Sequence, residues 1–325
     1  MSSGFKRICK LSAICVTALS VCFSASAKDS LSVGFYQPTY SVLDKAANSF
    51  ADHLHQISGG KMSAEIYSNG YLGSQSEMLR KVETGQLDIV FSSSSYLASY
   101  AGQFNVLSLP FFYDSYSQAR ESLNGEGGDY LKHILREHGL EHLGWMTLGF
   151  NQTSSNKLIL TCDDYRKVKY AYNPEELLSE ETIAAMGARP VAVNPASIYD
   201  VMAQKQVNAV CDTYSEIFSA KLEDYCRYLI EINQNLEVVS FIASRKTLAE
   251  LTSEQQSWLK RAAAMTCDEE WQMAEDNNMH ARSALINSGM TLIKFDNSPL
   301  KESVNSTVYA KYRQLYPDIF RKINR

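Results

Sequence analysis

The sequence LSVGFY at residues 31–36 precedes SVLDKAANSFADHLHQISGG at residues 41–60, and this opening decides the fold. The first stretch has the character of a β-strand, whereas the second carries apolar residues at helical spacing. Ser41 is placed to cap the helix, and two glycines at positions 59 and 60 are placed to end it. The opening therefore predicts a strand over 31–36 and a helix over 42–57.

The same pattern continues along the chain. We expect strands over 63–67 and 87–91 on either side of a helix over 76–84, which completes a β-α-β-α-β unit. The pattern recurs further on, with expected strands over 167–172, 189–193 and 207–211 and expected helices over 174–186 and 198–205. This alternation is typical of parallel, doubly wound sheets with right-handed crossovers, so two α/β lobes are predicted.

A long helix is expected late in the chain. Thr252 and Gln255 form a capping-box pattern, and helical spacing continues to residue 288. Such a helix is about 50 Å long at 1.5 Å per residue, so we expect it to cross both lobes. The predicted lobes are 28–150 with about 214–245, and 151–213 with about 246–325.

The N-terminus has the three parts of a signal peptide. Lys6, Arg7 and Lys10 precede an apolar stretch at 11–23, and Ala-Ser-Ala follows at 25–27. We expect cleavage near Ala27/Lys28 and export from the cytoplasm; the alternative is a retained N-terminal anchor. No later stretch approaches the roughly 20 apolar residues of a membrane helix, so no stable membrane insertion is expected.

Charge and cysteine usage narrow the range of functions. Loss of the signal moves the net charge from −5 to −8, and no basic patch suggests a nucleic-acid partner. Four cysteines remain, and in an oxidising compartment they permit disulfides in three connectivities or free thiols. They are Cys162, Cys211, Cys226 and Cys267.

No motif in the sequence indicates catalysis or a metal. The chain has no nucleophile elbow, zinc-protease, dinucleotide-binding or P-loop pattern. The histidine pairs 53/55 and 138/142 lack a carboxylate or cysteine at ligand spacing, and we interpret them as surface residues. We expect neither an enzyme nor a cofactor nor a metal site.

Ligands of α/β sheets bind beyond the carboxyl ends of the strands. That rule points to residues 36–40, 92–95, 172–173 and 212–214, which follow predicted strands. Two lobes that face each other across these ends would enclose a cleft.

Several linked motifs follow one another along the chain: YSNGYLG at 67–73, EML at 77–79, GQLD at 85–88, LSLPFF at 107–112, GFNQTSSN at 149–156 and GARP at 187–190. With these motifs the chain resembles, from residue 31 to the C-terminus, the DctP-like periplasmic solute-binding proteins of tripartite ATP-independent periplasmic (TRAP) transporters. The resemblance implies two lobes that close on a small organic solute, usually an acid. It also implies delivery to a TRAP permease in the membrane that is driven by an ion gradient.

The sequence departs from this family where a ligand carboxylate is usually bound. The resemblance places Ala171 where an arginine normally forms a bidentate salt bridge, Asn151 where a second arginine is frequent, and Asp212 where an asparagine is usual. An unpaired ligand carboxylate beside Asp212 and Glu77 would cost several kcal/mol. We therefore expect a neutral, amine-bearing or largely aromatic ligand rather than a simple dicarboxylate.

The candidate ligand-binding residues combine tyrosines with polar strand-end residues: Tyr36, Gln37, Tyr40, Glu77, Ser93, Asn151, Tyr170, Ala171, Tyr172, Asn194, Asp212 and Tyr214. Alternatives remain open at this point. Lys169 or Arg189 would replace the missing arginine if the alignment slips, Glu77 would serve only as a helix cap, and the tyrosines would be sheet surface. A solute sensor or scaffold, and an exported enzyme on the same scaffold, are the other functional hypotheses.

Overall fold

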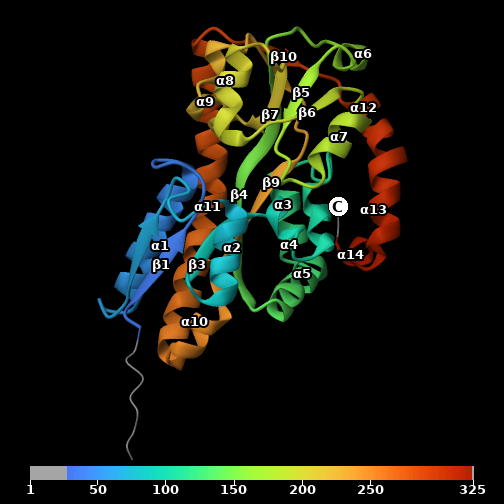
Figure 1. Cartoon of the computed structure of the whole chain (residues 1–325). Helices are drawn as coiled ribbons and strands as arrows, with labels where there is room; N and C mark the ends of the chain where they lie inside the picture. Colours follow the sequence, from blue (N-terminus) through green and yellow to red (C-terminus); the bar gives the residue numbers. More distant parts are fainter. Residues whose placement is uncertain (1–27, 324–325) are drawn as a thin grey trace, which may run out of the picture.

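The structure is a computed structural model that describes residues 28–323, in which two α/β lobes share one ten-stranded sheet (Figure 1). The predicted β-α-β-α-β opening is confirmed, and β1 pairs in parallel with both β2 and β3. Its elements are β1 (Ser30–Gly34), α1 (Val42–Ile57), β2 (Ser63–Tyr67), α2 (Gln75–Thr84) and β3 (Ile89–Ser93). Strand β3 thus begins and ends two residues later than expected.

The second lobe contains the parallel strands β5 (Lys169–Tyr172) and β6 (Arg189–Ala192), with β7 (Ala209–Thr213) beside β5. The predicted start of the helix expected over 174–186 is wrong, because α7 spans only Ser179–Ala185. Asn173 folds the residues that follow it into a turn: its side chain accepts from the Glu175 N–H at 3.1 Å and its carbonyl from the Glu176 N–H at 3.0 Å. Helices α8 (Ile198–Ala203) and α9 (Tyr214–Ser219) follow.

One strand runs through both lobes. Strand β4 (Leu140–Ser155) pairs antiparallel with β9 (Leu236–Ser244) over its first part and with β7 over 151–155. The complete strand order is β2-β1-β3-β9-β4-β7-β5-β6, and β8 (Tyr228–Glu231) joins β4 to β10 (Thr291–Lys294). The two lobes are therefore joined by hydrogen-bonded strands.

Helix α11 (Ser253–Asn287) contacts α1 in the first lobe and α9 in the second, as Figure 1 shows. Its start at the Thr252–Gln255 capping box confirms the predicted helix. Three of its buried side chains bind the backbone of β4. Glu270 accepts from the Thr147 N–H at 3.0 Å, Trp271 donates to the Trp145 carbonyl at 2.9 Å, and Asn278 donates to the Leu148 carbonyl at 2.6 Å.

Short helices complete the chain. After β10, the C-terminal segment turns back along the molecule, and Ile323 packs against Gly127 of α5. The remaining α-helices are α3 (Ser94–Leu97), α4 (Tyr116–Leu123), α5 (Glu126–Glu137), α6 (Cys162–Tyr165), α10 (Arg245–Glu250), α12 (Ser298–Val304), α13 (Ala310–Leu315) and α14 (Pro317–Lys322). Tyr214 and Ile217 of α9 pack in one core cluster with Ala171 of β5 and Val210 of β7, so α9 is described with the second lobe, although the predicted boundary assigned residues 214–245 to the first. The lobe boundaries otherwise stay a prediction.

Other expectations have different outcomes. All four cysteines named above are free thiols. The interpretation of His142 as a surface residue is wrong, because its side chain is buried against Trp145 in β4, where burial lowers its pKa well below the ordinary value. The predicted signal peptide lies outside the described residues, and none of the described helices is long and apolar enough to cross a membrane.

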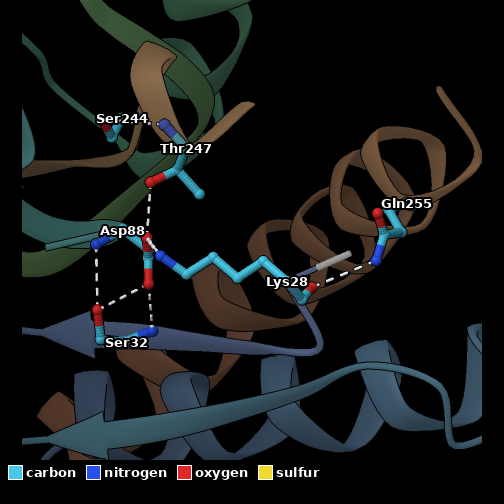
Figure 2. A network of polar contacts seen from close by, with 6 residues as sticks. All are labelled: Lys28, Ser32, Asp88, Ser244, Thr247 and Gln255. Carbon is cyan, nitrogen blue, oxygen red and sulfur yellow. Dashed lines mark hydrogen bonds and ion pairs between the residues drawn. The ribbon is translucent and has the colours of Figure 1, made fainter. Parts of the chain in front are cut away.

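A buried carboxylate, that of Asp88, ties Lys28, the first described residue, to the first lobe (Figure 2). Asp88 accepts from Lys28 Nζ at 2.5 Å, from the Ser32 backbone and hydroxyl at 2.9 Å each, and from Thr247 Oγ1 at 2.6 Å. Burial opposes its ionisation, but the ion pair and these hydrogen bonds outweigh burial and hold the pKa of Asp88 below its ordinary value. The network joins β1, β3 and the start of α10.

We expect Asp88→Asn to lower the free energy of unfolding by about 2–3 kcal/mol in urea denaturation, because it removes the buried charge that these donors satisfy. The difference from wild type should persist above about pH 5 and shrink as pH falls from about 4 through the lowered pKa of native Asp88, because the carboxyl of the unfolded chain binds its proton first. Asp29→Asn, which makes the same charge change at an exposed neighbour, should leave stability within about 0.5 kcal/mol of wild type. Equal losses for the two variants would contradict the structural role of Asp88.

Candidate ligand cleft

Polar side chains from both lobes meet where the sheet passes from one lobe to the other. Ser93 ends β3 and pairs with Val239 of β9, and Glu237 lies two residues before that partner. Asn151 of β4 lies across from Thr213 of β7, next to Asp212. The carboxyl ends of β3 and β7 thus face a common region, as the rule for ligand sites in α/β sheets requires.

Four carboxylates share this region, and they belong to four different segments. Asp212 lies in β7, Glu216 in α9, Glu237 in β9, and Glu176 in the turn before α7. All four are half-buried, and each lies close enough to at least one other for repulsion between them to affect its ionisation. We call these four residues the acidic cluster.

Burial and mutual repulsion make the acidic cluster reluctant to ionise. Burial, followed by the charge of neighbouring carboxylates, raises the pKa of Glu237 to about 8 and that of Asp212 well above its usual range. Burial likewise raises the pKa of Glu176 to about 7, with repulsion from Glu216 as a smaller cause. Burial also raises the pKa of Glu216, although hydrogen bonds from Thr213 and Gln37 oppose the shift.

No cation within residues 28–323 forms an ion pair with the acidic cluster. Lys169 and Arg189 are exposed and pair with each other in register at the amino ends of β5 and β6, whereas the cluster lies toward the carboxyl ends. Nor do the described histidine, cysteine, aspartate and glutamate side chains form any group of three or more suited to a metal ion. The cluster's charge is therefore balanced neither by a side chain nor by a metal site.

Neutral acceptors also line the cleft. A small cavity of about 30 Å³ is bordered by Glu176, Glu237, Asn151, Ser95 and Gln234. Gln234 Oε1 and the Ser95 hydroxyl are buried and have no hydrogen-bond partner within residues 28–323. Buried polar atoms are normally satisfied, so these two atoms are suited to contact a bound molecule.

The two lobes touch each other around this cavity. Gln37, which follows β1, hydrogen-bonds the Glu216 carboxylate of the second lobe. Ser76 Oγ of α2 donates to Glu175 at 3.1 Å, and Asn173 Nδ2 donates to the Tyr96 hydroxyl of α3 at 2.6 Å. The cleft is closed in this arrangement and must open to admit a solute larger than a water molecule.

Four of the candidate residues come together at the cleft: Gln37, Ser93, Asn151 and Asp212. Ser93 hydrogen-bonds Glu237, and Asn151 Nδ2 lies 3.5 Å from Glu237 Oε2. The Asp212 carboxylate has no hydrogen-bond partner within the described chain.

The remaining candidates have other surroundings. Tyr170 and Ala171 are buried in the core, and Tyr170 contacts Thr153 at 2.6 Å. Tyr172 and Tyr214 donate to Glu180 at 2.8 Å and Glu231 at 2.6 Å, Glu77 closes the capping box of α2, and Asn194 caps a short turn. Tyr36 and Tyr40 are 37% and 83% exposed, respectively. Their contact with a ligand stays a prediction.

Three members of the acidic cluster are absent from the residues predicted from the sequence, although each has a recognisable sequence feature. Glu237 is a lone acid in the apolar strand LEVVSFIAS, where a charge is unusual. Glu216 completes a capping box with Thr213 directly after a strand. Glu176 gave the weakest signal, because the turn that places it was predicted as helix.

The comparison with family models agrees with this architecture. The model of bacterial extracellular solute-binding protein family 7, DctP, matches residues 33–318. The chain belongs to this family. It is a TRAP-type solute-binding protein, a non-enzymatic component of a transporter, with the fold of the periplasmic binding proteins.

Individual relatives are distant. The C4-dicarboxylate-binding protein DctB of Bacillus subtilis is 26% identical over 72% of this chain and 70% of its own. A TRAP solute-binding protein of Chromohalobacter salexigens, solved with D-glucuronate, superposes with a TM-score of 0.85 at 19% identity, over 90% of this chain and 97% of its own. A second, from Sulfitobacter, solved with β-D-galacturonate, has a TM-score of 0.84 at 22% identity and the same coverage.

For this solute-binding protein without added solute, we expect Glu237→Gln to raise the free energy of unfolding at pH 8 by about 2 kcal/mol. A carboxyl with a raised pKa in the folded state destabilises the fold as pH rises from about 4 toward about 8, and glutamine has no such charge. At pH 5 the two proteins should unfold alike, in urea titrations monitored by circular dichroism. Glu275→Gln on the exposed face of α11 is the control, and a pH-independent difference for Glu237→Gln would contradict the buried-charge interpretation.

Proposed function

We propose that this protein captures a small organic solute between its lobes and delivers it to a TRAP permease for uptake driven by an ion gradient. We further propose that the solute is not a simple dicarboxylate. Family membership supports the transport role, and one observation carries the statement about the solute: four carboxylates interact at the cleft, Glu176 and Glu237 line its cavity, and none of the four has an ion-paired cation among the described residues. The candidate ligand-binding residues given above remain part of this proposal.

The absence of a balancing cation matters because a dicarboxylate brings two negative charges. Desolvating such a ligand next to the acidic cluster would add like-charge repulsion to an unfavourable burial, with no guanidinium to compensate. Asn151, where the resemblance described above places a frequent arginine, donates an amide hydrogen toward Glu237 and carries no positive charge. The site thus disfavours the ligand class named for the Bacillus subtilis relative.

The structural relatives show that the fold accommodates other solutes. Those from Chromohalobacter and Sulfitobacter hold D-glucuronate and β-D-galacturonate. At 19% and 22% identity, these similarities support the architecture of a cleft for small organic solutes. The charge of the preferred solute has to be inferred from the side chains of this chain.

A thermal-shift screen tests the proposed function. At 1 mM we expect succinate to change the unfolding midpoint by less than about 1 °C, whereas the captured solute, at a hundredfold excess over its Kd, raises it by about 5 °C or more. The screen should cover dicarboxylates, sugar acids, amino acids, amines and aromatic metabolites. A shift with succinate as large as that of any other compound would overturn the statement about the solute, and silence across all classes would contradict solute capture.

A further inference from the structure

Building on the proposed function, we propose that the captured solute is an organic cation: a small molecule with one or more protonated amines and no free carboxylate. The acidic cluster, the unpartnered acceptor Gln234 Oε1 and the lack of ion-paired cations together point to this class.

The charge of the cleft favours a positive ligand. Glu176, Asp212 and Glu216 belong to the second lobe and Glu237 to β9, so tertiary packing, and not one acidic stretch of sequence, brings the four carboxylates together. Such a cluster destabilises the protein unless something neutralises it. A protonated amine between the lobes would attract all four carboxylates and thereby favour the closed state.

The hydrogen-bonding groups match an ammonium. An ammonium offers three donors and no acceptor, so its site has to supply acceptors. Asp212 has a carboxylate free of protein hydrogen bonds within the described chain, and Gln234 Oε1 is buried without a donor. The Ser95 hydroxyl, also unpartnered, can serve as a further acceptor or as a donor to a hydroxyl of the ligand.

The geometry favours an organic cation over a metal ion. Ca²⁺ takes six to eight oxygen ligands at 2.3–2.6 Å, and a metal site brings several ligand side chains around one point. The described His, Cys, Asp and Glu side chains form no such group of three or more. Carboxylates that are spread around a cleft instead suit a cation with an extended carbon skeleton, and a diamine would reach more than one of them.

Ionisation of the cluster makes this binding depend on pH. Among residues 28–323, the groups that interact electrostatically with the cluster are Glu175, Cys211 and Tyr96, and none of these three is cationic. Glu176 and Glu237, whose pKa values are raised to about 7 and about 8, hold protons that an ammonium would displace. An alkylamine keeps its charge up to about pH 10, so affinity should rise between pH 6.5 and 8.5.

Isothermal titration calorimetry of the purified protein tests the inference. The probes are butylamine and the diamines of three to five carbons, with 1,4-butanediol as the uncharged match and D-galacturonate as the anionic one. We expect at least one amine to bind at least tenfold more tightly at pH 8.5 than at pH 6.5, and to release protons on binding at pH 6.5. Butanediol and galacturonate should bind at least a hundredfold more weakly than that amine at pH 8.5.

Variants separate the acidic cluster from general surface charge. Glu237→Gln and Asp212→Asn should each weaken amine binding at least tenfold, whereas Glu275→Gln on α11 should leave it within twofold. Circular dichroism and the unfolding midpoint check that each variant is folded. If Glu275→Gln weakens binding as much as the cluster variants, the effect is long-range and the inference fails.

The remaining outcomes distinguish the inference from the proposed function. Tighter binding of D-galacturonate than of every amine would overturn the organic-cation inference and leave solute capture intact. The inference also fails if none of the amines binds at pH 8.5, and solute capture itself fails only if the whole thermal-shift screen is silent as well.

Discussion

The antiparallel pairing of β4 with β9 is the constraint on which the rest of the structure depends. Because β4 continues past this pairing to bind β7 and β8, one strand fixes the position of the second lobe relative to the first. The cleft forms where β4 changes partners, and Asn151 and Glu237 lie at that change. Helix α11 reinforces the arrangement, since Glu270, Trp271 and Asn278 bind the backbone of β4 on its other side.

The cleft is costly for the protein to maintain. Half-buried carboxylates that repel one another lower stability, and proteins commonly keep such unfavourable groups only where function needs them. The contrast with Asp88 is instructive, because Asp88 is also buried but accepts four hydrogen bonds, one of them from a lysine. One acid stabilises the first lobe, and the acidic cluster is left for a partner from outside the chain.

The elements with strong local signals could be predicted from the sequence. Helix α1 has a serine cap, an apolar face and a pair of terminal glycines, and α11 has a capping box, so both were located closely. The start of α7 was misplaced because an Asn173 side chain competes with the helix for backbone hydrogen bonds.

The site was predictable only in part. Strand-end reasoning found Gln37, Ser93, Asn151 and Asp212, since the end of a strand is a local property. It missed Glu176, Glu216 and Glu237, because only tertiary packing brings these acids together. The prediction that His142 lies on the surface was wrong for a similar reason. Its burial results from tertiary packing, including the contact with Trp145, and the local sequence pattern does not indicate that packing.

The lobes are connected by continuous strands and a continuous helix, so they can move apart only by bending these elements and not by swinging on a flexible linker. Separating the lobes requires β4, β9 and α11 to bend together, because side chains of α11 are hydrogen-bonded to the backbone of β4. Gly149, at a bulge in β4 with φ of 109°, has no room for a side chain because Asn278 occupies that space. The stiffness of this junction, and not only the contacts in the cleft, will therefore govern how long a solute stays bound before it is released.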